Sequence, residues 1–187
     1  MNTHLEIEWD DIEYFLQSST GTNEPWLWKR ICSHPVIASE LISSPRDGVD
    51  WCCISKNPGI AMDDIDQHPD LPWDWEFGVS RNPNLIMDFV LMHLDKKWNW
   101  NCIGKHSNIT MDDIDQHLKL PWVWHGGSFG CIGGISSNPN LTVDFVLKHR
   151  DKDWNWSKVS GHSNITMHDI FEHDELPWEV FGGISMN

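Results

Sequence analysis

Histidine and aspartate recur along this sequence at a fixed spacing, and these are side chains that bind zinc and transfer protons. Five histidines each precede a tryptophan by five residues, namely His68, His93, His117, His149 and His173. Four of these histidines follow an aspartate by five residues, namely Asp63, Asp88, Asp112 and Asp144, and the fifth follows His168 in the same way. By residue type alone, the pattern indicates a metal-binding protein or a hydrolase that uses the repeated His and Asp residues.

The spacing argues against that chemistry. A zinc site needs three or four ligands that converge on one point, whereas residues repeated once per structural unit lie in a row, one unit apart. We therefore interpret the histidines as structural residues near helix C-termini, where the helix dipole favours them. The sequence also lacks the CxxC, HExxH and phosphate-binding glycine motifs, and its run Gly126-Gly127-Ser128-Phe129-Gly130, which fits the letters GxSxG, lies in a Gly-rich insert that we interpret as a long loop. We expect no catalytic residue, no metal ligand and no cofactor, and hence no enzyme.

The elements that position these residues are tandem sequence units. Measured between the five histidines, successive units are 25, 24, 32 and 24 residues long. The longest interval contains a Gly-rich insert at residues 126–134. Residues 31–187 form the array, and residues 1–30 keep only a Pro25-Trp26-Leu27-Trp28 ending. Such a degenerate first unit is typical of a capping repeat, whose outer face meets water.

Each unit begins with the signature of a helix start. In residues 109–117, Thr110 is a good N-cap, and Asp113 stands at the third helical position of a capping box. Met111, Ile114 and Leu118 share one helical face, which predicts that all three are buried. The pattern predicts an α-helix of two to three turns. A Trp-x-Trp segment follows, in which a short helix, 3-10 in type, is favoured over a strand. The predicted fold is an all-α solenoid of about 24-residue units, each holding one short α-helix and one short 3-10 helix.

The chain contains 13 tryptophans, most of them in Trp-x-Trp pairs. The later position of a pair is replaced by Cys53 and Val180 in two units, which predicts that it is a core position. The earlier position is tryptophan in each unit, namely Trp51, Trp73, Trp98, Trp122, Trp154 and Trp178. These earlier tryptophans are either a ladder that holds neighbouring units together or an exposed recognition row, and we favour the ladder.

Two resemblances rest on these motifs. The Asn-Pro-containing helix starts at 82–90 and 138–146 are similar to those of leucine-rich-variant α-solenoids, although that family uses small aliphatic residues where this chain has Trp and His. The run NPNLTxDFVLKHxDKxWNW, followed by NITMxDIxxHxxLPWxW, resembles Trp-rich tandem repeats in proteins of giant, mimivirus-like DNA viruses. The second resemblance covers residues 31–187 and implies a viral setting, without implying an activity.

The net charge of −15 makes the chain a poor partner for nucleic acid phosphates or anionic membranes, although tryptophan can stack on bases. No apolar run is long enough to cross a membrane, and the N-terminus does not resemble a signal peptide. The five cysteines are odd in number and irregularly spaced, namely Cys32, Cys52, Cys53, Cys102 and Cys131. This predicts reduced thiols and an intracellular location, which would be the host cytoplasm or the virion for a viral protein.

A repeat array without a unique polar cluster predicts a non-enzymatic scaffold for protein–protein interaction or self-assembly. Residues 181–187 repeat the opening of another unit, as seen at residues 77–82. The helix before them would then present an apolar face, which invites association. We therefore expect self-association through residues 165–187, with Ile170 and Phe181 as the candidate contact residues.

Overall fold

The structure is a computed structural model that describes residues 31–45, 47–126 and 133–179. The expected capping unit at residues 1–30, the middle of the Gly-rich insert and Phe181 lie outside this part of the chain. Within these ranges every regular element is a helix and none is a strand, so the all-α prediction is confirmed for the described residues. None of the described helices is long and apolar enough to cross a membrane.

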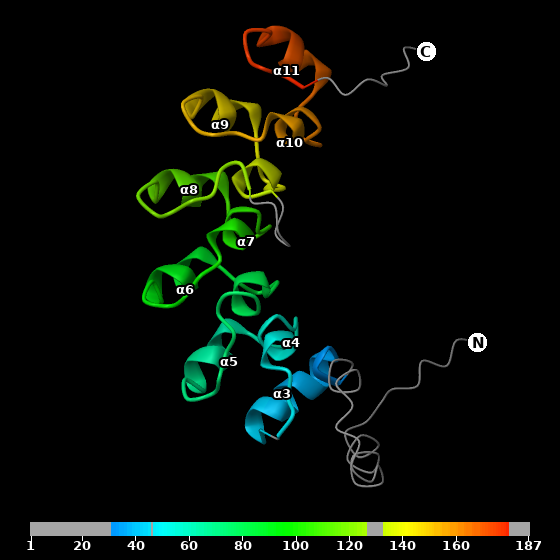
Figure 1. Ribbon diagram of the computed structural model, residues 1–187, viewed down its shortest axis with the longest axis vertical. Coiled ribbons are helices and arrows are strands. Elements are labelled where there is room, and N and C mark those ends of the chain that lie inside the picture. Colours follow the sequence, from blue (N-terminus) through cyan, green and yellow to red (C-terminus); the bar gives the residue numbers. More distant parts are fainter. Residues whose placement is uncertain (1–30, 46, 127–132, 180–187) are drawn as a thin grey trace, which may run out of the picture.

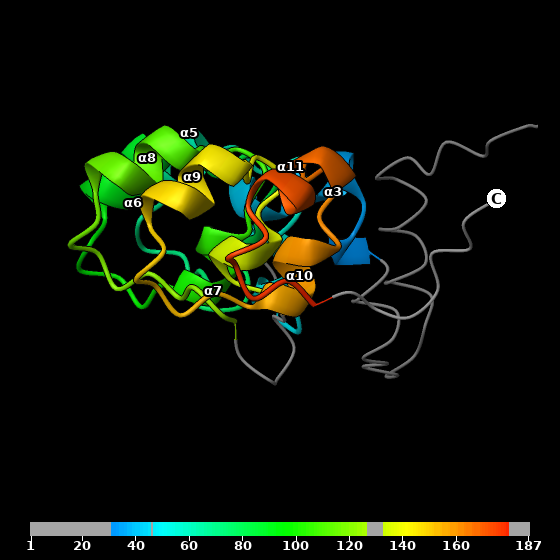
Figure 2. The ribbon, with the colours of Figure 1, turned by 90° about the horizontal axis from the view of Figure 1, so that it is seen from above.

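The helices form two layers that lie side by side, and within each layer successive helices follow one another along the longest axis of the molecule (Figure 1). One layer holds α3 (Pro35–Ser43), α5 (Met62–Gln67), α6 (Met87–Met92), α8 (Met111–Gln116), α9 (Val143–Lys148) and α11 (Met167–Glu172). The other layer holds α4 (Trp51–Ser55), α7 (Trp100–Gly104), α10 (Trp156–Ser160) and the 3-10 turns η1 (Val79–Arg81) and η2 (Ile135–Ser137). Seen along the long axis, the two layers are separate (Figure 2). The short helices are thus α-helical in some units and 3-10 in others, whereas the sequence fitted a single turn of either type and favoured 3-10.

The helix starts follow the predicted capping chemistry. Thr110 Oγ1 accepts a hydrogen bond from the Asp113 N–H at 3.1 Å, and the Asp113 carboxylate accepts one from the Thr110 N–H at 2.8 Å. Thr166 and Asp169 form the same capping box in α11. These helices contain only six residues, so the prediction of two to three turns was wrong.

The tryptophan spacing explains why the helices end so early. Each of the five register histidines is the C-cap of its helix, as predicted. The indole N–H of the tryptophan five residues later donates to the main-chain carbonyl of that histidine, at 2.7–2.9 Å in all five units. The bond satisfies one of the carbonyls that a helix leaves unpaired at its C-terminus. The fixed spacing therefore depends on a histidine carbonyl, and the imidazole takes no part in it.

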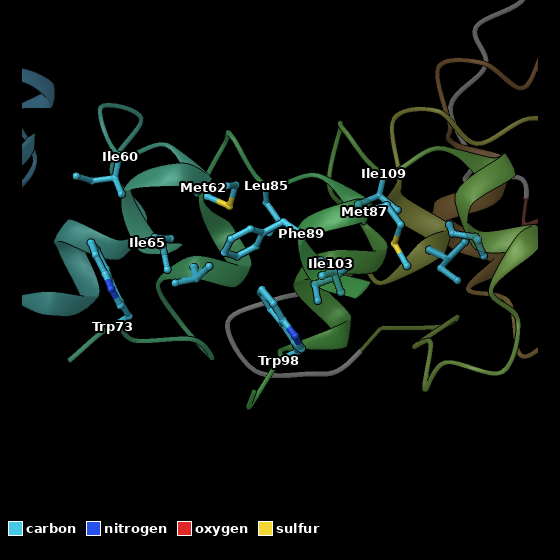
Figure 3. Close-up of a cluster of buried hydrophobic side chains, with 14 of the residues drawn as sticks. Ile60, Met62, Ile65, Trp73, Leu85, Met87, Phe89, Trp98, Ile103 and Ile109 are labelled. Atoms are coloured by element: carbon cyan, nitrogen blue, oxygen red, sulfur yellow. The ribbon is translucent and has the colours of Figure 1, made fainter. Parts of the chain in front are cut away.

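Apolar side chains fill the space between the two layers in a continuous row (Figure 3). Met111 and Ile114 are buried as predicted, and so are their equivalents Met62 and Ile65 in α5. The prediction for Leu118 was wrong, because α8 ends at Gln116 and the side chain of Leu118 is 44% exposed.

Tryptophans from neighbouring units meet edge to face. The later tryptophan of one unit contacts the earlier tryptophan of the next, as Trp75 does with Trp98 at 5.3 Å and Trp100 with Trp122 at 5.2 Å between ring centroids. Trp51 contacts Trp73 in the same way and begins α4 as Trp100 begins α7. Trp51 is therefore a later tryptophan, and assigning it to the earlier position was wrong by two residues.

The Gly-rich insert leaves the main chain around it unchanged. The N–H groups of Ile135 and Ser136 donate to the carbonyls of Val123 and Trp124, as those of Val79 and Ser80 do to Asp74 and Trp75. Ten residues separate Trp124 from Ile135, whereas three separate Trp75 from Val79, so the insert adds seven. Gly126 and Gly133 both have positive φ, and a Cβ on Gly126 would lie 2.4 Å from the Gly133 nitrogen. Glycine at both ends of the insert thus lets its two ends meet.

The cysteines only partly follow the sequence prediction. Cys32, Cys52 and Cys53 are free thiols, and burial raises the pKa of each of them. Cys102 is disulfide-bonded, so the prediction of reduced thiols throughout was wrong.

We predict that Trp98→Ala lowers the free energy of unfolding by about 3–5 kcal/mol, because the mutation removes a buried ring and the donor to the C-cap carbonyl of α6. Trp178→Ala should cost less, since Trp178 is only half-buried. Chemical denaturation of both variants measures the difference. Equal small losses would contradict the role assigned to the earlier tryptophans.

Candidate functional site

A row of polar side chains joins each unit to the unit before it. We call it the inner row, and it consists of Asn57, Asn82, His106, Asn138 and His162. Each member forms a hydrogen bond to the main-chain carbonyl of the row position one unit upstream, beginning with Asn57 Nδ2 to the Cys32 carbonyl at 2.7 Å. His106 Nε2 and His162 Nε2 reach the carbonyls of Asn82 and Asn138, each at 2.9 Å. The row is continuous over the described units.

The asparagines of the inner row each approach several carbonyls. Asn138 Nδ2 lies 2.9 Å from the carbonyls of Gly104 and Ile109 and 3.2 Å from that of His106. Asn82 Nδ2 makes the equivalent contacts one pair of units earlier. Both asparagines are fully buried. Ser55 and Gly104 end α4 and α7, so each asparagine supplies a donor to a helix-terminal carbonyl, which is costly to leave unpaired when buried. The two loop carbonyls also accept from other groups.

A second row runs parallel to the first, two residues further along each unit. This outer row consists of Asn84, Asn108, Asn140 and Asn164. Each of its amides donates to two carbonyls of the preceding unit, as Asn140 does to Ser107 at 2.7 Å and Ile109 at 3.1 Å. Gly59 stands at the first place of the row, where a Cβ would lie 2.2 Å from the Pro35 carbonyl oxygen.

The hydrogen bonds of His106 define its protonation state. Nδ1 accepts from the Asn108 N–H at 3.2 Å, so the proton stands on Nε2, which donates to the Asn82 carbonyl. An imidazolium would lose the first of these bonds. Burial lowers the pKa of His106 below its usual 6.5, although the bond to Asn82 acts in the opposite direction.

Serines form a third set of contacts between units. The hydroxyl oxygen of Ser80 accepts from the N–H of Asn99 at 3.0 Å, and that of Ser136 from the N–H of Asn155 at 2.9 Å. Ser55 and Ser160 do the same with Asp74 and Glu179. The acceptors are thus hydroxyl groups held in a fixed orientation, and none of them lies beside a histidine as a nucleophile would.

The repeated His and Asp residues do not gather at one point. His93 Nε2 lies 2.7 Å from an Asp66 carboxylate oxygen, and His149 Nε2 lies 2.9 Å from one of Asp115, so these pairs link neighbouring units. The described residues contain no group of three His, Cys, Asp or Glu side chains that could hold a metal ion. The pairs act as polar contacts between helices of one layer.

The candidate tryptophans lie mostly in the interior. Trp73, Trp98, Trp122 and Trp154 are buried, and only Trp178 is half-exposed. A row of exposed rings for recognition is therefore not present at the four buried positions.

Helix α11 differs from its equivalents in what it exposes. Met167 is 46% exposed, whereas Met62 and Met111 at the same place in α5 and α8 are 7% and 9% exposed. Ile170 is half-buried, and Phe171 is 74% exposed. The candidate contact residue Ile170 thus lies beside an exposed apolar face on α11, while Phe181 lies beyond the described residues.

Sequence reasoning missed the asparagine rows. Asn108, Asn140 and Asn164 lie in turns, each followed two residues later by the threonine that caps the next helix, and neither role indicates a bond to another unit. A signal existed, because asparagine or histidine recurs at one position of every unit from residue 57 onward. The acceptors are main-chain carbonyls, which leave no trace in the sequence.

Comparison with family models, with curated proteins and with solved structures finds no match to this chain. The function therefore has to be inferred from the contacts described above.

We predict that Asn138→Ala lowers the free energy of unfolding by about 3 kcal/mol, because the buried Gly104 carbonyl loses its donor and the carbonyls of His106 and Ile109 each lose one of two bonds. Asn164→Ala is the matched control, since its amide is exposed and water can replace it, and it should cost about 1 kcal/mol or less. Urea denaturation of the two variants checks the difference. A loss for Asn138→Ala no larger than the control would contradict the role of the inner row.

The lowered pKa of His106 predicts a pH dependence of stability. As the pH falls below about 6.5, the unfolded chain takes up the proton first, so the native state loses stability down to the lowered native pKa. His106→Asn removes this loss, because Asn57, Asn82 and Asn138 form both bonds at the equivalent place without titrating. We measure the free energy of unfolding by denaturation between about pH 8 and pH 5, the range in which histidine titrates. The free energy of unfolding of the variant should rise relative to that of the wild type as the pH falls. A constant difference would contradict the assignment.

Proposed function

We propose that this chain is a non-enzymatic repeat scaffold that binds other protein chains, further copies of itself included. We further propose that its fold is an α-solenoid of about 24-residue units. The recurrence of the inner row, the outer row and the tryptophan contacts at intervals of one unit supports the solenoid. Contacts of this kind, made only between neighbours, are typical of repeat proteins.

One observation supports the scaffold proposal most strongly, and it concerns the contacts of the asparagine, serine and histidine side chains. Asparagine, serine and histidine side chains bond to main-chain groups of the adjacent unit, so they are committed to stacking. Catalysis needs a convergent set of such groups beside a substrate site. The apolar face on α11 offers a surface for a protein instead.

The alternative is a metalloprotein or hydrolase built on the His and Asp rows. It has less support, because the His–Asp contacts of the described residues are separate pairs and no third ligand joins them there. The resemblance of the tandem motifs to repeats of giant DNA viruses supports a viral origin, with the host cytoplasm or the virion as the location. Protein partners, rather than nucleic acid or a membrane, fit the net charge of −15.

The test uses the full chain without a His tag, in wild-type form and as Ile170→Glu. We expect both to be free of stoichiometric metal by elemental analysis. We also expect the wild type to form a complex, with a partner or with itself, that the charged variant loses, because burying a carboxylate in an apolar contact is unfavourable. Sedimentation over a hundredfold range of concentration, about the span needed to separate weak from tight association, detects the second outcome.

Ile170 is half-buried, so the thermal unfolding of Ile170→Glu has to be compared with that of Met92→Glu, an exposed methionine on α6. Stoichiometric zinc or iron in the wild type would contradict the scaffold proposal. A complex that the folded Ile170→Glu variant forms as readily as the wild type would contradict the placement of the binding surface on α11.

A further inference from the structure

The junctions between successive units are of two kinds, which alternate from Asn82 onward. At two junctions an asparagine of the inner row reaches back to the preceding unit, namely Asn82 between α5 and α6 and Asn138 between α8 and α9. At the other two junctions a histidine takes that place, namely His106 between α6 and α8 and His162 between α9 and α11. We call them the asparagine junctions and the histidine junctions.

The histidine junctions use both nitrogens of the imidazole. His162 Nε2 donates to the Asn138 carbonyl at 2.9 Å, and its Nδ1 accepts from the Asn164 N–H at 3.2 Å. His106 makes the same two bonds at its own junction. Both bonds require a neutral ring, because a protonated Nδ1 would direct its N–H at another N–H. An asparagine makes both contacts without titrating, as Asn82 does through Nδ2 and Oδ1.

The asparagine junctions contain a second histidine contact, in which protonation acts in the opposite direction. His93 Nε2 lies 2.7 Å from Asp66, and His149 Nε2 lies 2.9 Å from Asp115. Each pair gains a charge–charge attraction when its histidine is protonated. The hydrogen bonds from Lys148 and His149 hold the pKa of Asp115 below its usual value, so this carboxylate stays ionised in mild acid. Mild acid therefore tightens these junctions.

The histidine junctions lack this pair because leucine replaces the aspartate. Leu91 and Leu147 stand where Asp66 and Asp115 stand, two residues before the C-cap histidine. An ion pair does cross one histidine junction, from Arg150 to Glu175 at 3.0 Å. Both of its side chains are about half exposed, and exposed ion pairs contribute little to stability.

The imidazoles of His106 and His162 form no ion pair within the described ranges. The charged and titratable side chains on the elements packed around His106 are Arg81 of η1, Asp88 of α6, the adjacent Lys105, and Asp112, Asp113 and Asp115 of α8. Those on the elements around His162 are Asp144 and Lys148 of α9, Lys158 of α10, and His168, Asp169 and Glu172 of α11. Protonation of either ring thus gains no paired carboxylate there, and it loses the bond to Nδ1.

We infer that mild acid loosens the array at the histidine junctions and leaves the asparagine junctions closed. Protonation of His106 and His162 removes a hydrogen bond from the first kind of junction, and protonation of His93 and His149 adds charge to the second kind. In acid the pairs α5 with α6 and α8 with α9 stay together as blocks, and the array bends or opens between them. The inference concerns the shape of the array and does not depend on the proposed binding of protein partners.

The burial of His106 sets the direction of the effect. Burial lowers the pKa of His106 below 6.5, whereas in a loosened junction the ring meets water. The loosened state therefore binds the proton more readily than the closed state. Its population rises as the pH falls below about 6.5, the ordinary value of histidine.

Amide hydrogen exchange of the full chain, measured by NMR, tests the inference at two equivalent sites. The Asn99 N–H donates to Ser80 Oγ across the first histidine junction at 3.0 Å. The Asp74 N–H donates to Ser55 Oγ across the preceding asparagine junction, also at 3.0 Å. Each exchange rate is compared with that of an unstructured peptide at the same pH, which gives a protection factor.

We expect the protection factor of Asn99 to fall by about fivefold or more between about pH 7.5 and about pH 5.5, the range in which histidine titrates. That of Asp74 should stay constant or rise. His106→Asn should remove the fall at Asn99 without changing Asp74. Asp66→Asn should remove any rise at Asp74 and leave the fall at Asn99.

The comparison of Asn99 with Asp74 in the wild type needs no variant. Constant protection of Asn99, or an equal fall at both sites, would overturn the inference. A fall at Asn99 that persists in a folded His106→Asn variant would also overturn it. Each of these results would leave the proposed scaffold function standing, because that function is tested by complex formation.

Discussion

The structure depends on one interaction, the hydrogen bond from a buried asparagine or a histidine to the main-chain carbonyl at the same position one unit upstream. Asn82 and Asn138 each donate to the carbonyl of the last residue of a short helix, Ser55 of α4 or Gly104 of α7, and to carbonyls of the loop that follows that helix. Without such donors, loops of this kind could not be buried between units. The bond fixes the distance between units, because donor and acceptor belong to equivalent positions. Apolar packing then fills the space that this distance leaves.

Helices of five or six residues are too short to be stable alone, so every element here relies on its neighbours. The indole of an earlier tryptophan closes its own helix through a histidine carbonyl and meets a tryptophan of the preceding unit edge to face. The same tryptophan side chain therefore ends its own helix and packs against the neighbouring unit. The Gly-rich insert shows how local the requirement is, since seven extra residues leave the surrounding hydrogen bonds in place.

The sequence predicts what is encoded within one unit. The capping box of Thr110 and Asp113, the C-cap position of the histidines and the burial of Met111 and Ile114 all follow from spacing. The sequence did not predict features that depend on residues of an adjacent unit. The role of the asparagines depends on carbonyls of another unit, and the assignment of Trp51 depended on a helix start that Asp50 sets. The α11 face was expected from the repeat register, but the exposure of Met167 and Phe171 requires the fold.

Side-chain amide exchange measured by NMR tests the central claim most directly, because it reports on the Nδ2 protons of individual asparagines. The account predicts that the amides of Asn82 and Asn138 are strongly protected and exchange only when the units separate, whereas that of the exposed Asn164 exchanges much faster. Exchange of the Asn82 and Asn138 amides at the rate of the Asn164 amide, in a folded chain, would contradict the claim that these bonds hold the units together.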